Sequence, residues 1–315
     1  MLCFYKFRVL YLSLFVITFA GTCFADQTRE IPKFVIDFLE LPTLAPQPKI
    51  GKQFYTSFET IEEFKPFYIV PQNNQNTATH DLVDNPRFVG NHAHEAHIYG
   101  SNDVSSTENT NHRAYPTFQF AKTPMGILTG AVFVEFEVWA DIELSHRENA
   151  SWFSLATFTS YDDQYWYRAY LINVDANYNI HLMHVPHHGQ SIHDIYQTTS
   201  IALPKKQWAR ISTYIDYTTK NRFNSPFIAV WQDGVLVSAA RFDNRVDLIT
   251  AFMSNNRPKC LNGLSTATPI ADAEIACGLN FTNGLAQAHF GLYAPPLLDS
   301  GQILNDDLTV SEVLF

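Results

Sequence analysis

Hydrophobic and polar positions alternate with a period of two over most of the chain after residue 50. The clearest stretch is 132–139, where every even position is apolar and the odd positions include Glu135 and Glu137. Because successive side chains of a strand point to opposite faces, this period predicts a half-buried strand. The same reasoning predicts further strands at 64–70, 94–99, 117–121, 152–159, 165–174, 180–185, 208–215, 227–231, 235–241, 289–293 and 308–313.

The connections between these segments are short and agree with an all-β chain. Asp233-Gly234 stands between two apolar runs, which is typical of a two-residue hairpin turn. A short helical piece at 34–41 is expected, but no segment after residue 50 carries a helical stripe, and no long repeat is visible. The pattern therefore predicts one all-β domain, a two-sheet antiparallel sandwich or jelly roll.

The N-terminal residues 1–25 have the three parts of a secretory signal peptide. Lys6 and Arg8 precede an apolar run at 9–20, and small residues lead to a cleavage point after Ala25. A membrane-spanning helix is the alternative, but it needs about 18 or more consecutive apolar residues. We expect a secreted or periplasmic protein with no membrane span.

The mature chain divides into a proline-rich lead-in at 26–50 and a sandwich domain at 51–315. Within the domain, 255–284 is rich in Asn, Gly, Ala and Thr and has no strand period. Cys260 and Cys277 lie there, and in an exported chain they most simply form one disulfide that staples a loop insertion.

Charge limits the class of partner. The chain has 21 Lys plus Arg against 31 Asp plus Glu, and removing the two signal-peptide cations leaves 19 against 31, or −12. Nucleic acid binding requires clustered cations, which this sequence lacks. Aromatic residues make up 14% of the chain, which fits carbohydrate contact through ring stacking.

Two common catalytic arrangements fit poorly. On a strand, His92 and His94 face one way and His97 the other, so the three cannot share one zinc ion without a bulge. Glu135 and Glu137 share a face, as a pair of glycosidase acids would. Sandwich glycosidases of the laminarinase type use Glu-x-Asp-x-x-Glu, however, and the third acid is absent here.

A third set suits β-elimination from a uronic-acid polysaccharide. Arg113 lies in a predicted turn with Gln119 on the following strand, and His289 and Tyr293 share one face of a later strand. Arg and Gln can neutralise the C5 carboxylate, a neutral His can remove the C5 proton, and Tyr can act as base or as acid to the leaving oxygen.

These residues resemble motifs of jelly-roll polysaccharide lyases, the heparin lyase I, glucuronan lyase and alginate lyase families. His289-Phe-Gly-Leu-Tyr293 resembles their Lys-x-Gly-x-Tyr strand, and Arg113 with Gln119 resembles their Arg-plus-Gln strands. The segment 301–310 resembles the last strand of concanavalin-A-like sandwiches. The resemblance implies a concanavalin-A-like jelly roll that acts on a uronate-containing glycan, with Tyr293 as acid or base.

The departures from the family pattern concern the base and a fixed positive charge. His289 stands where the family has Lys, and histidine titrates near neutrality. No Gln-x-His strand motif is present, so the base is inferred from strand order: His94 is the first choice and His97 the rival. The hypothesis requires His94, Arg113, Gln119 and Tyr293 to converge on one face.

We expect substrate contacts from five further positions: His97, His289, Tyr167, Arg168 and His184. The competing hypothesis is a non-catalytic, lectin-like sandwich that binds an acidic polysaccharide or another glycan. A glycoside hydrolase whose acids are distant in sequence is a third alternative.

No cofactor is required by this chemistry, although a structural calcium ion would fit such a sandwich. Asn305 and Asp306 offer oxygen ligands of the kind calcium prefers. The same residues before a strand also form ordinary turns. We expect a monomer.

Overall fold

The computed structural model describes a defined part of the chain. The described residues are 30–41, 47–64, 68–73, 77–102, 110–147, 150–159, 167–187, 194–196, 201–218, 221–222, 226–241 and 284–315. Residues 1–25, Cys260, Cys277 and most of 255–284 lie outside them, so the signal peptide, its cleavage site and the disulfide remain predictions.

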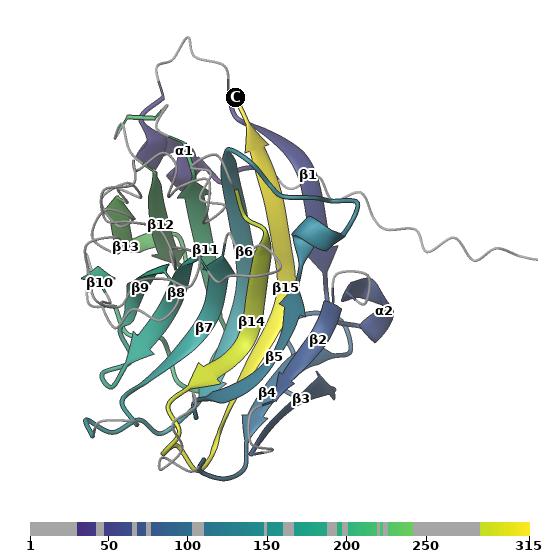
Figure 1. Cartoon of the computed structure of the whole chain (residues 1–315), viewed down its shortest axis with the longest axis vertical. Coiled ribbons are helices and arrows are strands. Elements are labelled where there is room, and N and C mark those ends of the chain that lie inside the picture. Colours follow the sequence, from purple (N-terminus) through teal and green to yellow (C-terminus); the bar gives the residue numbers. More distant parts are fainter. Residues whose placement is uncertain are drawn as a thin grey trace, which may run out of the picture.

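The described strands form two antiparallel sheets, which confirms the predicted all-β sandwich (Figure 1). The eight-stranded sheet has the order β13-β12-β11-β6-β15-β4-β3, and β1 also pairs with β15. Its strands are β1 (Lys49–Thr56), β3 (Ala78–Val83), β4 (Ala93–Ile98), β6 (Ala131–Asp141), β11 (Ala209–Asp216), β12 (Phe227–Gln232), β13 (Val235–Arg241) and β15 (Gly301–Leu314).

The seven-stranded sheet has the order β10-β9-β8-β7-β14-β5-β2. Its strands are β2 (Tyr68–Asn73), β5 (His112–Phe118), β7 (Trp152–Thr159), β8 (Tyr167–Asp175), β9 (Ile180–His187), β10 (Asp194–Tyr196) and β14 (Gln287–Ala294). Strands that are distant in sequence become neighbours, since β14 pairs with both β5 and β7.

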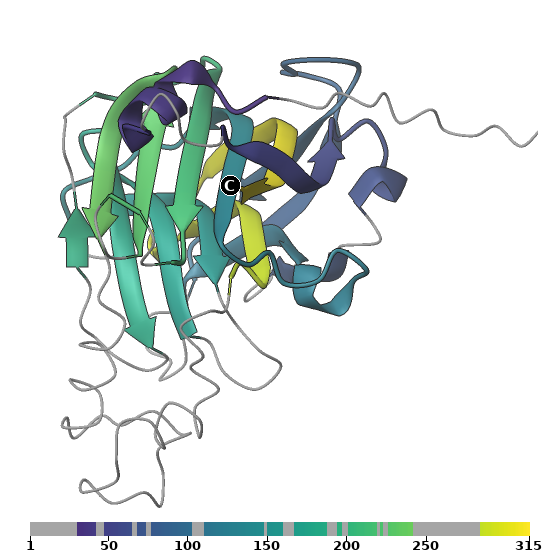
Figure 2. The same ribbon diagram turned by 90° about the horizontal axis from the view of Figure 1, so that it is seen from above.

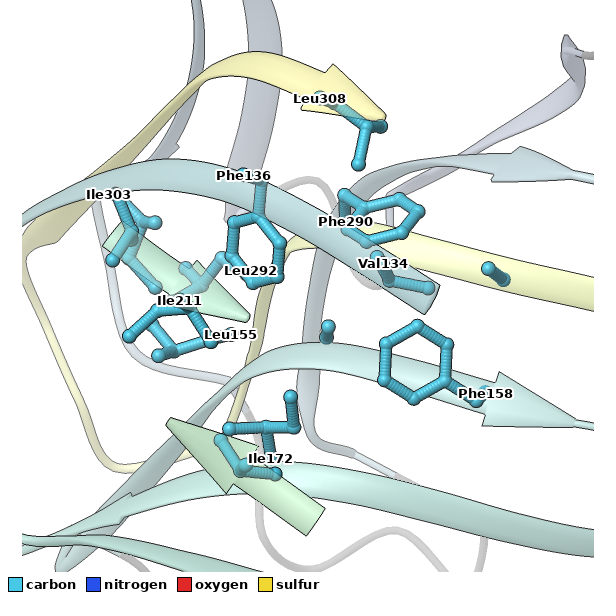
Figure 3. Packing of buried hydrophobic residues seen from close by; sticks show 14 of the residues in the cluster. Val134, Phe136, Leu155, Phe158, Ile172, Ile211, Phe290, Leu292, Ile303 and Leu308 are labelled. Atoms are coloured by element: carbon cyan, nitrogen blue, oxygen red, sulfur yellow. The ribbon is translucent and has the colours of Figure 1, made fainter. Parts of the chain in front are cut away.

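The main core fills the space between the two sheets. Phe136 from the eight-stranded sheet packs against Phe290 from the seven-stranded sheet, with ring centroids 5.4 Å apart. Figure 3 shows aliphatic and aromatic side chains from both sheets interdigitating around this pair. Full burial of one such side chain contributes about 1.5–3 kcal/mol, so this layer holds the two sheets together.

One hairpin follows the sequence prediction directly. Gln232 pairs with Val235, and Asp233 and Gly234 both have positive φ, at 50° and 80°. Positive φ at both central positions matches the right-handed twist of the flanking strands, which explains the Asp-Gly pair.

The helices are short, and one of them covers part of a sheet. Helix α1 (Lys33–Leu39) lies against the eight-stranded sheet near β11 and β12, where Phe38 meets Trp231 edge-on at 5.3 Å (Figures 1 and 2). The lead-in thereby buries Val35 and Leu39 in a second apolar cluster. Helix α2 (Ile61–Phe64) and the 3₁₀ turn η2 (Phe120–Lys122) complete the helices of the described residues, and none of these could cross a membrane.

Candidate functional site

The outer face of the seven-stranded sheet, meaning the face directed away from the core, carries Arg113 and Tyr293. Arg113 on β5 is the register partner of Tyr293 on β14, and its guanidinium carbon lies 6.0 Å from the phenol ring centroid. Asn111 Nδ2 donates a hydrogen bond to Tyr293 Oη at 2.9 Å, and the Trp152 ring lies 5.5 Å away. All four residues are partly exposed, so a ligand can reach a cation and a phenolic hydroxyl together.

Strand alternation explains why these side chains point outward. Ala114, Leu292 and Ala294 belong to the core between the sheets. Because neighbours along a strand point to opposite faces, Arg113 and Tyr293 must face away from it. The local pattern and the pairing of two strands therefore create the site together.

Gly291 allows β14 to approach β5 closely. Its φ is +134°, and a Cβ added there would lie 2.7 Å from the carbonyl oxygen of Ala114 and 3.0 Å from Tyr115 Cβ. Any side chain would therefore push the strand that carries Tyr293 away from the strand that carries Arg113. Ser154 and Thr157 join Gly291 in lining a shallow depression beside Tyr293.

We expect Gly291→Ala to lower the free energy of unfolding by about 3 kcal/mol, because it combines backbone strain with a steric clash. Gly130→Ala is the matched control, since Gly130 has φ +89° with nothing within 4 Å of the added Cβ. That variant should lose only the strain component, about 1 kcal/mol. Urea unfolding of both proteins tests this, and equal losses would show that close approach at Gly291 is unimportant.

His289 is buried beneath this surface. It is 3% exposed and stacks on Tyr115, with centroids 4.4 Å apart and an interplanar angle of 13°. Its Nε2 lies 2.8 Å from Gln287 Nε2. Burial, assisted by the positive charge of Arg113, lowers the pKa of His289 to about 3. His289 is therefore neutral at physiological pH and cannot supply the fixed positive charge of a lysine.

Gln119 lies on the same side of the sheet but far from Arg113. It follows β5 directly, between Phe118 and Phe120, which are both in the core. Six residues of extended strand separate it from Arg113, a distance of about 20 Å. The expectation that Arg113 and Gln119 bind the same carboxylate is therefore wrong. Arg113 lies near the start of β5, and Gln119 lies just beyond its end.

Comparison with known proteins finds likeness only in the fold. No family model and no curated protein matches the chain. An endo-β-1,4-glucuronan lyase from the fungus Trichoderma reesei has a TM-score of 0.49 at 12% identity, covering 84% of this chain and 95% of that one. An alginate lyase from a Chlorella virus has 0.48 at 9% identity, covering 82% and 98%. A cellulose-induced protein has 0.45 at 11% identity, covering 77% and 88%.

The structure does not bring His94 to this site. His94 lies on β4 of the other sheet, is 1% exposed, and places its Nε2 3.1 Å from His80 Nδ1. Its ring lies 5.5 Å from Phe58, and burial holds its pKa well below the usual range. The structure therefore corrects the choice of His94 as the base. The order of strands along the chain did not reveal which sheet β4 would join.

His97, the rival base, lies on the same strand as His94 and is paired with Gln302 and Thr79. It is partly exposed and its ring lies 6.4 Å from that of Tyr99. It too belongs to the eight-stranded sheet, so neither candidate histidine meets Tyr293. A substrate contact from His97 at this site is therefore excluded by its place in the fold.

For three of the predicted substrate-binding residues the structure describes only the backbone. Tyr167 pairs with His187 across β8 and β9, Arg168 follows it on β8, and His184 pairs with Tyr170. Their strands belong to the seven-stranded sheet. Their side chains lie outside the described part of the structure, so their contacts with substrate remain predictions.

The possible calcium ligands do not form a site. On β15, Asn305 pairs with Val138 of the core, and Asp306 pairs with Glu137 on the opposite face. Asp306 Oδ2 accepts hydrogen bonds from the backbone N–H groups of Phe88 and Val89, both at 3.0 Å. Within the described ranges, no group of three His, Cys, Asp or Glu side chains could hold a metal ion. Asn305 and Asp306 therefore point to opposite faces of β15 and do not converge on one ion.

Sequence reasoning assigned no role to Asn111, and it placed Trp152 on a strand without assigning it to this site. Asn111 precedes β5 and Trp152 begins β7, so each lies at the end of a strand where the alternation signal is weakest. Asn111 stands two residues before Arg113, which places it on the same face of an extended chain. That spacing is the one signal that could have identified it.

Proposed function

We propose that this protein is a polysaccharide lyase that cleaves a uronate-containing glycan by β-elimination. The observation that carries the proposal is the pair of partly exposed side chains on neighbouring strands, Arg113 beside Tyr293, with Asn111 hydrogen-bonded to the phenol oxygen. The reaction needs a cation at the sugar carboxylate and a proton-transfer group beside it, and this pair supplies both.

The electron and proton movements follow from this arrangement. A guanidinium group binds a carboxylate through paired charge-assisted hydrogen bonds, which stabilises the negative charge that grows there when the C5 proton leaves. The C5–H electron pair forms the C4=C5 double bond, and the C4–O bond breaks. The departing glycosidic oxygen then takes a proton, so the products are an unsaturated uronate end and a new hydroxyl group.

Tyr293 would carry the proton in both steps. The described histidines of this outer face, His181 and His289, are buried and their pKa values are lowered chiefly by burial. The Tyr293 phenolate takes the C5 proton and the phenol returns it to the leaving oxygen. The hydrogen bond from Asn111 Nδ2 holds the Tyr293 oxygen on this face, with the Arg113 guanidinium beside the ring.

A non-catalytic glycan-binding protein is the second candidate, and the positions of two histidines favour it. His94 lies in the other sheet, and His289 is neutral and buried at the position where the lyase pattern has lysine. A sandwich with this face could therefore bind a glycan without cleaving it. Ultraviolet absorbance of unsaturated ends, followed with glucuronan, alginate and heparin-type substrates, separates the two functions. Binding without absorbance on any substrate would favour the binding protein.

We expect Arg113→Ala to lower kcat/KM by about 10- to 100-fold, because a charge-assisted hydrogen bond contributes about 1.5–3 kcal/mol. Arg113→Lys keeps the charge but loses the paired geometry, so its loss should be smaller. Initial rates of absorbance increase at low substrate concentration give the ratio. Unchanged kcat/KM in the alanine variant would exclude Arg113 from carboxylate recognition.

A further inference from the structure

Two large apolar side chains are held at the surface by a loop that is fastened to the eight-stranded sheet. Phe88 and Val89 are 44% and 42% exposed, in the loop 84–92 between β3 and β4. Their backbone N–H groups both donate to Asp306 Oδ2 at 3.0 Å, and Asp306 is fully buried on β15. The loop therefore presents these side chains at a defined place, although leaving large apolar groups in water is unfavourable.

Two tryptophans lie beside this loop, on the face of the eight-stranded sheet directed away from the core. The Phe88 ring lies 5.9 Å from that of Trp208, at an interplanar angle of 60°. Trp139 and Trp208 are the next positions beyond the register pair of Val138 and Ala209, which belongs to the core. Alternation therefore turns both tryptophans outward, and both are partly exposed. The aromatic patch formed in this way consists of Phe88, Val89, Trp139 and Trp208.

A guanidinium group with available donors lies beside the aromatic patch. Arg210 is two residues from Trp208 along the chain, and its side chain is 46% exposed. Its Nε donates to Glu137 Oε1 at 2.7 Å, which orients the planar group. Within the described part of the chain, the two terminal amino groups make no hydrogen bond. Their N–H groups can therefore donate to a ligand that lies over the neighbouring rings.

Carboxylates surround this guanidinium group. Partial burial acts to lower the pKa of Arg210, but the hydrogen bond and the charge of Glu137 act more strongly and raise it. The charges of Glu135 and Asp307 act in the same direction. Three acids around this cation make the local charge negative at neutral pH, so a polyanion would be repelled. The surface beside the aromatic patch therefore favours an uncharged ligand.

The size of the surface favours a sugar chain over a protein partner. A pyranose ring presents a flat face of C–H groups that can stack on aromatic rings, while its hydroxyl groups accept hydrogen bonds from N–H donors. A stable protein interface needs about 800 Å² and about 20–30 residues from each partner. The aromatic patch and Arg210 form a much smaller area, which one or two sugar units would cover.

We propose that this surface is a second, non-catalytic binding site for an uncharged polysaccharide. A sugar ring stacks on Phe88 and Trp208 and accepts hydrogen bonds from Arg210. The site lies on the opposite sheet from Arg113 and Tyr293, so a neutral glycan can hold the protein while the proposed lyase site stays open. The inference stands on its own residues and does not depend on the lyase function.

Affinity electrophoresis in gels that contain hydroxyethyl cellulose, β-1,3-glucan, xylan or mannan tests this inference. We expect at least one of these polymers to retard the wild-type protein, and Phe88→Ala to raise its dissociation constant about tenfold, equivalent to about 1.4 kcal/mol. Phe88→Trp keeps an aromatic ring and should retain the affinity within a few-fold. Phe315→Ala is the matched control, because Phe315 is 61% exposed beyond the far end of β15. Its retardation should equal that of wild type.

Several outcomes would overturn the inference. Absence of retardation by all four polymers would do so, and so would retardation that Phe88→Ala leaves unchanged. Loss of retardation in Arg113→Ala but not in Phe88→Ala would assign the neutral glycan to the other sheet. Self-association that Phe88→Ala abolishes, without any retardation, would make the aromatic patch a protein interface instead. Elimination is measured separately on a soluble uronate polymer, so a failure of the lyase function does not alter these results.

Discussion

Replacing Tyr293 with phenylalanine should lower the elimination rate by about 10³-fold or more while glycan binding and the fold are retained. The variant loses one oxygen atom, and that atom is the proposed carrier of the proton between C5 and the leaving oxygen. Proton transfer by a positioned side chain contributes about 10²–10⁴-fold, and here one group serves two steps. The ring remains, so its contacts with Trp152 and the Arg113 guanidinium are preserved.

Tyr115→Phe is the matched control for this experiment. Tyr115 lies on the same strand as Arg113, is 4% exposed, and stacks on His289 through its ring. Its hydroxyl has no part in the proposed chemistry, so activity should stay within a few-fold of wild type. Absorbance rates, with circular dichroism to verify folding, distinguish the two variants. Full turnover by Tyr293→Phe would remove Tyr293 from the mechanism.

Acidification should destabilise the protein steeply below pH 6.5, because buried histidines must become charged. Burial lowers the pKa of His289 to about 3 and that of His80 to about 4, and His94 shifts in the same direction. Between these values and 6.5 the unfolded chain binds protons that the native protein does not. Stability therefore falls as pH falls through this window.

The expected size follows from the same relation. From pH 6.5 to 5.0, His289 and His80 each lower the free energy of unfolding by about 2 kcal/mol. Asp306 acts in the opposite direction: burial raises its pKa to about 6, so it favours the native state as pH falls from 6 towards 3.8. Glu137 and Asp216 are shifted the same way, and they too offset part of the loss.

A single substitution isolates the histidine contribution from these opposing carboxyl groups. His289→Gln keeps a polar side chain but cannot titrate, so its stability should fall about 2 kcal/mol less than that of wild type over the interval. Urea unfolding at several pH values gives both profiles. Any constant loss from the substitution cancels in this comparison. Parallel profiles for the two proteins would show that His289 is not kept neutral by burial.

Prediction from sequence succeeded where the controlling physics is local. The alternation at 132–139 identified β6, and the Asp-Gly pair identified the turn between β12 and β13. Arg113 and Tyr293 meet on the outer face, but Arg113 lies on β5 and not in the predicted turn, and the catalytic roles of both residues stay predictions. Gln119 lies beyond the end of β5 and not on a following strand, about 20 Å along the chain from Arg113.

The sequence by itself determined which side of each strand is apolar, because alternation depends only on neighbouring residues. It did not determine which strands become neighbours. Pairing of β5 with β14 joins segments about 180 residues apart, and it depends on closing the whole sandwich around one core. That closure placed Tyr293 beside Arg113. It placed His94 in the opposite sheet. It also buried His289, so that desolvation, which has no signature in the sequence, made this residue neutral.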